Sequence, residues 1–227
     1  MIERLEDRVP PEAIAWLQDA AAEVAQEPAK IATRFPAVGR KVGRGPLEAN
    51  ADPDDVHAWT IDDAARTVLL QALPHPEDEI RELYRFGDAA ERRGILRALE
   101  YLDVDALDVV EDAIRTNDTR LIAAALGPYA TKHLSDSAYD QAMLKCVFVG
   151  VPITPLHGLD RVTADGARML AALVHERVAA GRDVPAEVWT VIDRHPPEDE
   201  IAAIVAELKS PYEDRRVAAE RALGGRP

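Results

Sequence analysis

Apolar residues recur every three or four positions along most of this chain, and short polar segments separate the runs. This spacing is typical of amphipathic helices, and no run shows the strict alternation of a half-buried β-strand. Capping residues precede several runs, as at Thr60 with Asp63 and at Asp88 with Glu91. The pattern predicts an all-α fold, either a HEAT-like solenoid of helical hairpins or an irregular α-bundle, in a single domain over residues 1–227.

The punctuation of the sequence predicts where the helices begin and end. Two Gly/Pro-rich stretches, residues 39–53 and 150–161, are expected to be loops. The sequence EDEI occurs twice, beginning at Glu77 and at Glu198, which leaves open a true internal repeat or a chance similarity between two proline-led helix starts. The expected helices cover approximately residues 11–26, 28–35, 60–73, 76–86, 88–101, 105–115, 118–126, 137–149 and 163–180, with short ones opening at Pro185, Pro197 and Pro211. Residues 129–134 are expected to form a short turn.

The charge of the chain is strongly acidic, with a formal net charge of −14 and a pI near 4.9. Two stretches depart from this balance. Residues 30–44 carry five basic residues and no acid, and residues 129–182 carry six Lys/Arg against five Asp/Glu. A local positive potential within an acidic protein favours the binding of an anionic ligand.

Composition and charge argue against several classes of binding partner and against several cellular locations. The acidic balance argues against nucleic acid and against an anionic membrane surface. The single cysteine, Cys146, allows no internal disulfide and fits a reducing compartment. The start of the chain, MIERLEDRV, lacks the basic and apolar regions of a signal peptide, and no apolar stretch approaches the length of a membrane span. We therefore expect a soluble cytoplasmic protein without stable membrane insertion.

The segment 137–149 is apolar on nearly every side at helical spacing, so it is expected to be a central helix. Lys145 lies on its narrow polar stripe and would need an acidic partner or an anionic ligand. The alternative is a lysine whose stem reaches out to solvent. Cys146 lies on the apolar face and is expected to behave as a small hydrophobic residue.

The segment 163–180 carries three further candidates. Arg177 falls within its apolar stripe, which favours a carboxylate or phosphate partner, or else a contact with the last carbonyls of the helix. Arg168 and His175 share another face, two turns apart. His175 with Glu176 lacks the second histidine of a zinc-protease helix. Because no spacing of histidines fits a dedicated ligand set, we expect no metal and no cofactor.

The segment 38–46 reads VGRKVGRGP and places Arg40, Lys41 and Arg44 among glycines. Glycines let backbone amides approach an anion, and arginine matches the geometry of phosphate. The segment is not a Walker loop, since GxxxxGK[ST] is absent. A solvated basic loop is the alternative interpretation.

Three stretches together resemble the EboA family. They read RFPAVGRKVGRGPL, NDTRLIAAALGPYATKHLSDSAYDQAMLKCVFVGVPITPLHGLD and ARMLAALVHERVAAGRDVPAEVW. The resemblance spans most of the chain and contains no catalytic signature. EboA-like proteins are encoded in bacterial and algal ebo clusters beside enzymes that resemble a prenyltransferase and a sugar-phosphate cyclase. The resemblance therefore implies a place in secondary-metabolite handling, and it supplies no mechanism.

Three functions remain open from the sequence. The first is a non-enzymatic helical scaffold or ligand-binding protein for an anionic, phosphorylated small molecule such as a cyclitol or polyprenyl phosphate. The second is an enzyme acting on such an intermediate, with His133 or His175 as general acid/base and Lys145 as stabiliser. The third is an acidic adaptor for other ebo-pathway proteins. The candidate ligand-binding residues are Arg40, Lys41, Arg44, Tyr129, His133, Lys145, Arg168, His175 and Arg177.

Overall fold

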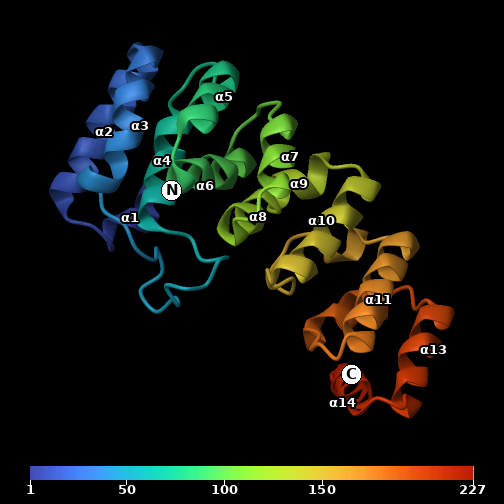
Figure 1. Cartoon of the computed structure of the whole chain (residues 1–227). Coiled ribbons are helices and arrows are strands. Elements are labelled where there is room, and N and C mark those ends of the chain that lie inside the picture. The colour runs from blue at the N-terminus through green and yellow to red at the C-terminus, as the bar shows by residue number, and fades with distance from the viewer. Residues whose placement is uncertain (227) are drawn as a thin grey trace. The chain divides into compact units, whose positions relative to one another are not determined.

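The computed structural model describes residues 1–226, and these residues form fourteen α-helices and no β-strand (Figure 1). The predicted all-α fold is confirmed, whereas its arrangement as a solenoid or a bundle stays a prediction. The chain divides into two compact units, Met1–Ala130 and Thr131–Pro227, so the single domain also stays a prediction. Within residues 1–226, no helix combines the length and the apolar character that crossing a membrane requires.

The first unit contains eight complete helices. They are α1 (Ile2–Glu6), α2 (Pro11–Gln26), α3 (Ile31–Lys41), α4 (Ile61–Gln71), α5 (Glu77–Phe86), α6 (Ala89–Ala98), α7 (Leu107–Arg115) and α8 (Thr119–Ala125). The boundary between the units falls inside α9 (Pro128–His133).

Helix α4 is the centre of the first unit. Every residue from Ile61 to Leu70 is buried, and the helix packs against α1, α2, α3 and α6 (Figure 1). The helix begins at the predicted capping box, in which Thr60 Oγ1 accepts from the Asp63 amide at 3.3 Å and Asp63 Oδ2 accepts from the Thr60 amide at 3.2 Å. Gly94 lets α6 approach closely, since a Cβ there would lie 2.9 Å from Cδ of Arg66.

Helix α3 extends further than the sequence suggested. The expected end was near Phe35, but the helix continues through Pro36 and Gly39 to Lys41. Ile31, Phe35 and Val38 are buried and keep one apolar stripe facing the core, which outweighs the hydrogen bond that Pro36 cannot donate. The predicted loop therefore begins only after Lys41.

The segment between α3 and α4 leaves the core and returns to the start of α4. Gly43 and Gly45 adopt positive φ angles of 123° and 101°, which favour glycine. The return is held where the Leu47 amide donates to the Trp59 carbonyl at 2.7 Å and the Ile61 amide donates to the Gly45 carbonyl at 2.9 Å. The 13 residues from Leu47 to Trp59 are called the 47–59 loop below.

The second unit contains five complete helices. They are α10 (Asp136–Val149), α11 (Ala164–Ala179), α12 (Trp189–Ile192), α13 (Glu198–Ala206) and α14 (Glu213–Gly224). Helix α11 packs against the other four. Ser135 caps α10 by accepting from the Ala138 amide, and Thr163 caps α11 by accepting from the Gly166 amide. Gly181, with φ of 66°, follows the end of α11.

Two buried polar contacts tie the second unit together. Asp140 on α10 is 3% exposed and accepts from the Thr163 amide at 3.0 Å and from the Thr163 hydroxyl at 2.6 Å. Trp189 is fully buried, and its indole Nε1 donates to the Ala222 carbonyl of α14 at 2.7 Å.

Helix α10 is less completely covered than its apolar sequence suggested. Tyr139, Met143 and Cys146 are buried, but Phe148 is 68% exposed. Phe148 and Leu144 line an open apolar groove along α11. The expectation of a helix covered on every side was wrong on this face, because a pattern of apolar residues does not show whether a second partner helix is present.

Candidate functional site

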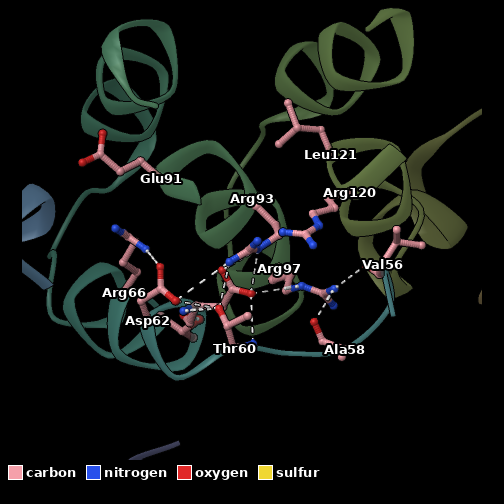
Figure 2. A network of polar contacts seen from close by, with 12 residues as sticks. Val56, Ala58, Thr60, Asp62, Arg66, Glu91, Arg93, Arg97, Arg120 and Leu121 are labelled. Atoms are coloured by element: carbon pink, nitrogen blue, oxygen red, sulfur yellow. Dashed lines mark hydrogen bonds and ion pairs between the residues drawn. The ribbon is translucent and has the colours of Figure 1, made fainter. Parts of the chain in front are cut away.

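A network of charged side chains lies inside the first unit, between α4 and α6 (Figure 2). Asp62, Asp63 and Arg66 on α4 are at most 2% exposed, and Arg93 and Arg97 on α6 are each 9% exposed. Charges this deeply buried need partners, because desolvation strongly disfavours an isolated ion. This network of paired charges is not explained by apolar packing, so it is the first candidate for a functional site in this unit.

Asp63 is the centre of the network. Its two carboxylate oxygens accept from Arg93 Nε at 3.0 Å each, and Arg97 Nε lies 3.4 Å from Oδ2. Burial raises the pKa of the Asp63 carboxyl, and the attraction of Arg93 and Arg97 opposes that rise. Burial likewise lowers the pKa of the Arg97 guanidinium, while Asp63 opposes the change. The attraction between Asp63 and Arg97 thus partly offsets the cost of burying these two charges.

Two further contacts give the arginines fixed directions. Arg93 Nη2 donates to Thr60 Oγ1 at 2.9 Å. Arg97 Nη2 donates to the carbonyls of Val56 and Ala58 at 3.1 Å each, so it holds one end of the 47–59 loop against α6 (Figure 2). Asp62 pairs with Arg66, whose Nη1 lies 2.5 Å from Oδ2. Its Oδ1 accepts from Thr60 Oγ1 at 2.8 Å and lies 3.9 Å from Arg93 Nη2.

A pocket of about 240 Å³ lies at the solvent side of this network. Arginines from three separate segments line it, namely Arg44 after α3, Arg93 on α6 and Arg120 on α8. Figure 2 shows Arg120 close to the network. Within residues 1–226, neither Arg44 nor Arg120 has a carboxylate within 4.0 Å of its guanidinium. The other charged groups that line the pocket are Asp52, Asp55 and Asp62.

This arrangement is suited to holding an anion. Arginine presents several N–H donors in a plane, which match the oxygens of a phosphate or carboxylate. Arg93 is oriented in advance by Asp63 and Thr60, so binding would not need to order it. No cluster of three His, Cys, Asp or Glu side chains in the described part of the chain is placed to hold a metal ion.

The residues predicted in the first unit lie in different settings. Arg44 lines the pocket. Arg40 and Lys41, at the end of α3, are exposed and do not line it. Tyr129 is buried, and its hydroxyl donates to the Val104 carbonyl at 3.1 Å and accepts from the Ala106 amide at 2.8 Å. These two hydrogen bonds fix the Tyr129 hydroxyl inside the unit, so packing alone explains where this side chain lies.

In the second unit, three of the predicted residues contact three different groups. Arg168 is exposed and pairs with Asp165 at 2.9 Å. His175 Nε2 lies 3.6 Å from Glu207 Oε1. Arg177 Nε donates to the Asp183 carbonyl at 2.8 Å, which lies beyond the end of α11 at Ala179 and is not one of the last carbonyls of the helix.

The other two candidate residues of this unit, His133 and Lys145, lie on different helices. His133 is exposed at the end of α9. Lys145 is half-buried and lines the apolar groove between α10 and α11 together with Glu176. The role of all five residues in ligand binding stays a prediction.

Cys146 is fully buried on α10, and burial raises the pKa of its thiol to about 12. A thiol in this state is almost entirely protonated near neutral pH and is a weak nucleophile. The structure agrees here with the interpretation of Cys146 as a small hydrophobic residue.

Sequence reasoning missed Arg93, Arg120 and the buried aspartates. Arg93 and Arg97 belong to a helix with several charged residues, which in the sequence looks like an ordinary solvent-exposed helix. Asp63 was recognised only as a capping residue. The available signal was the pair Asp62–Asp63 followed by Arg66 within an otherwise apolar helix, which needs buried cations nearby.

Comparison with known proteins identifies the family. No curated protein and no solved structure shows a significant match to this chain. One family model does match, and it covers residues 1–193, which include the whole first unit and α10 to α12 of the second. The family is described as metabolite traffic protein EboA. The protein therefore belongs to the EboA family.

Proposed function

We propose that this protein binds a small anionic metabolite, carrying a phosphate group, in the pocket of the first unit, and that it does so without catalysing a reaction on it. The observation that carries the proposal is the convergence of Arg44, Arg93 and Arg120 from three segments on one pocket. Such convergence brings the N–H donors of three guanidinium groups to one place, although Asp52, Asp55 and Asp62 line the same pocket.

The pocket combines a fixed cation with two adaptable ones. Arg93 is buried and oriented by Asp63 and Thr60. Arg44 and Arg120 are exposed at the rim, where their side chains can move to enclose a ligand. This division suits reversible binding, since a preorganised donor reduces the entropy lost on binding while mobile side chains allow entry and release.

The family and the size of the pocket support the same class of ligand. The EboA description, metabolite traffic, fits a protein that binds and hands on a small molecule. A volume of about 240 Å³ is just below the range of about 300–1,000 Å³ that drug-sized ligands occupy. The proposal therefore favours a small polar phosphate over a long polyprenyl phosphate.

Removing either rim arginine is expected to weaken anion binding. Arg44→Gln and Arg120→Gln should each raise the Kd for inorganic phosphate by about 10- to 100-fold, because a hydrogen bond to a charged group contributes about 1.5–3 kcal/mol. Isothermal titration calorimetry of the full chain measures both values.

Arg40→Gln is the matched control, since Arg40 belongs to the same basic run but lies outside the pocket lining. Its Kd should stay within about twofold of the unsubstituted protein, because its charge is screened from the pocket by solvent. Equal losses in all three variants would show a diffuse charge effect and would contradict binding in this pocket.

A further inference from the structure

Two aspartates of the 47–59 loop share the pocket with the arginines. Asp52 and Asp55 both line it and are exposed. Each uses one carboxylate oxygen to fix the loop, because Asp52 Oδ1 accepts from the Asp54 amide at 2.9 Å and Asp55 Oδ1 accepts from the His57 amide at 2.8 Å. Within residues 1–226, neither carboxylate has a cationic group within ion-pair distance.

The other acids near the pocket are already neutralised. Asp62 pairs with Arg66, and Asp63 pairs with Arg93 and Arg97. Besides Arg93, which Asp63 orients, the charged groups that remain to meet a ligand are thus the cations Arg44 and Arg120 and the anions Asp52 and Asp55. A ligand that is only an anion would be attracted by the first pair and repelled by the second.

The carboxylates are also held in place. Arg97, itself fixed by Asp63, donates to the carbonyls of Val56 and Ala58, the first of which directly follows Asp55. The loop therefore presents its carboxylates from a backbone that is anchored to the buried network. A carboxylate fixed in this way can accept a hydrogen bond from a donor of the ligand.

We infer that the ligand carries, beside its anionic group, a hydrogen-bond donor that Asp52 and Asp55 recognise, either a hydroxyl or an ammonium group. This inference rests on the proposed function and adds the chemistry of the rest of the molecule. The arginines hold the phosphate, and the loop carboxylates select ligands whose adjoining carbons bear donors over those that are bare hydrocarbon.

Three phosphates with the same three-carbon chain test the inference, namely n-propyl phosphate, glycerol 3-phosphate and 3-aminopropyl phosphate. Titration calorimetry of the full chain should show the two donor-bearing compounds binding about tenfold more tightly than propyl phosphate, which is the effect of one hydrogen bond to a charged group. The order of the two tells whether hydroxyl or ammonium is the natural donor, and either order supports the inference.

The double variant Asp52→Asn with Asp55→Asn should bind all three compounds with Kd values within about twofold of one another, because the amide removes the charge that attracts the donor. Asparagine keeps the Oδ1 acceptor, so the loop contacts to the Asp54 and His57 amides are retained. Asp54→Asn is the control, since Asp54 is exposed on the same loop but does not line the pocket, and it should keep the preference.

The outcomes separate the two proposals. If propyl phosphate binds as tightly as the other two, and Arg120→Gln weakens all three, the pocket holds an anion but does not select a donor, and the inference is overturned. If none of the three compounds binds, the proposed function is overturned as well. A preference that persists in the double Asn variant also overturns the inference, because another group must then contact the donor.

Discussion

Replacing Asp63 with alanine is expected to lower the free energy of unfolding of the first unit by about 3–5 kcal/mol, because breaking a buried ion pair leaves its partner uncompensated. Asp63 is fully buried and is the shared partner of Arg93 and Arg97. Its removal leaves two guanidinium groups, each 9% exposed, facing an empty position, and it also removes half of the capping box of α4.

Glu91→Ala is the matched control for this variant. Glu91 has the same place in the second capping box, where its Oε2 accepts from the Asp88 amide at 3.0 Å, but it has no buried arginine as partner. Losing a cap alone lowers stability by about 1 kcal/mol. Urea unfolding followed by circular dichroism measures both variants. A loss in Asp63→Ala as small as that in Glu91→Ala would contradict the central role of the carboxylate.

Trp189→Ala is expected to lower the stability of the second unit by about 3–5 kcal/mol, the usual loss for truncating a buried large aromatic side chain. The indole is fully buried and donates to the Ala222 carbonyl of α14, while the Arg226 guanidinium lies 5.2 Å from the ring centroid. The variant removes both the volume that α14 covers and the indole donor to the Ala222 carbonyl near the end of this helix.

Hydrogen exchange shows where the loss occurs, because it reports the opening of each helix individually. The amides of α14 should lose protection in Trp189→Ala. Trp16→Ala is the control, because Trp16 is a half-buried tryptophan of α2 in the first unit, and its loss should leave α14 protected. Unchanged protection of α14 in Trp189→Ala would show that the indole does not hold this helix.

Local features of the structure could be predicted from the sequence. The caps at Thr60 and Asp88 were expected and are both present. A cap depends on residues two or three positions apart, so its signal is complete within a short window. For the same reason the all-α class could be predicted from periodicity alone.

The site could not be predicted in the same way. Asp63 and Arg93 are 30 positions apart, and although Asp62–Asp63 in an apolar helix indicates a need for buried cations, nothing near Arg93 in the sequence shows that it is one of them. Clusters of charge along the chain pointed to Arg40, Lys41 and Arg44, of which only Arg44 lines the pocket. The contrast shows that charge density along a chain locates exposed basic segments, whereas a pocket is assembled from cations that tertiary packing brings together.

The position of the lone cysteine has a practical consequence. Cys146 is the only thiol in the chain, and it lies buried in α10 of the second unit. An alkylating reagent therefore finds no target in the first unit and reaches this sulfur only when the second unit opens. The native sequence thus contains its own reporter, through which the opening of one unit can be timed without labelling the other.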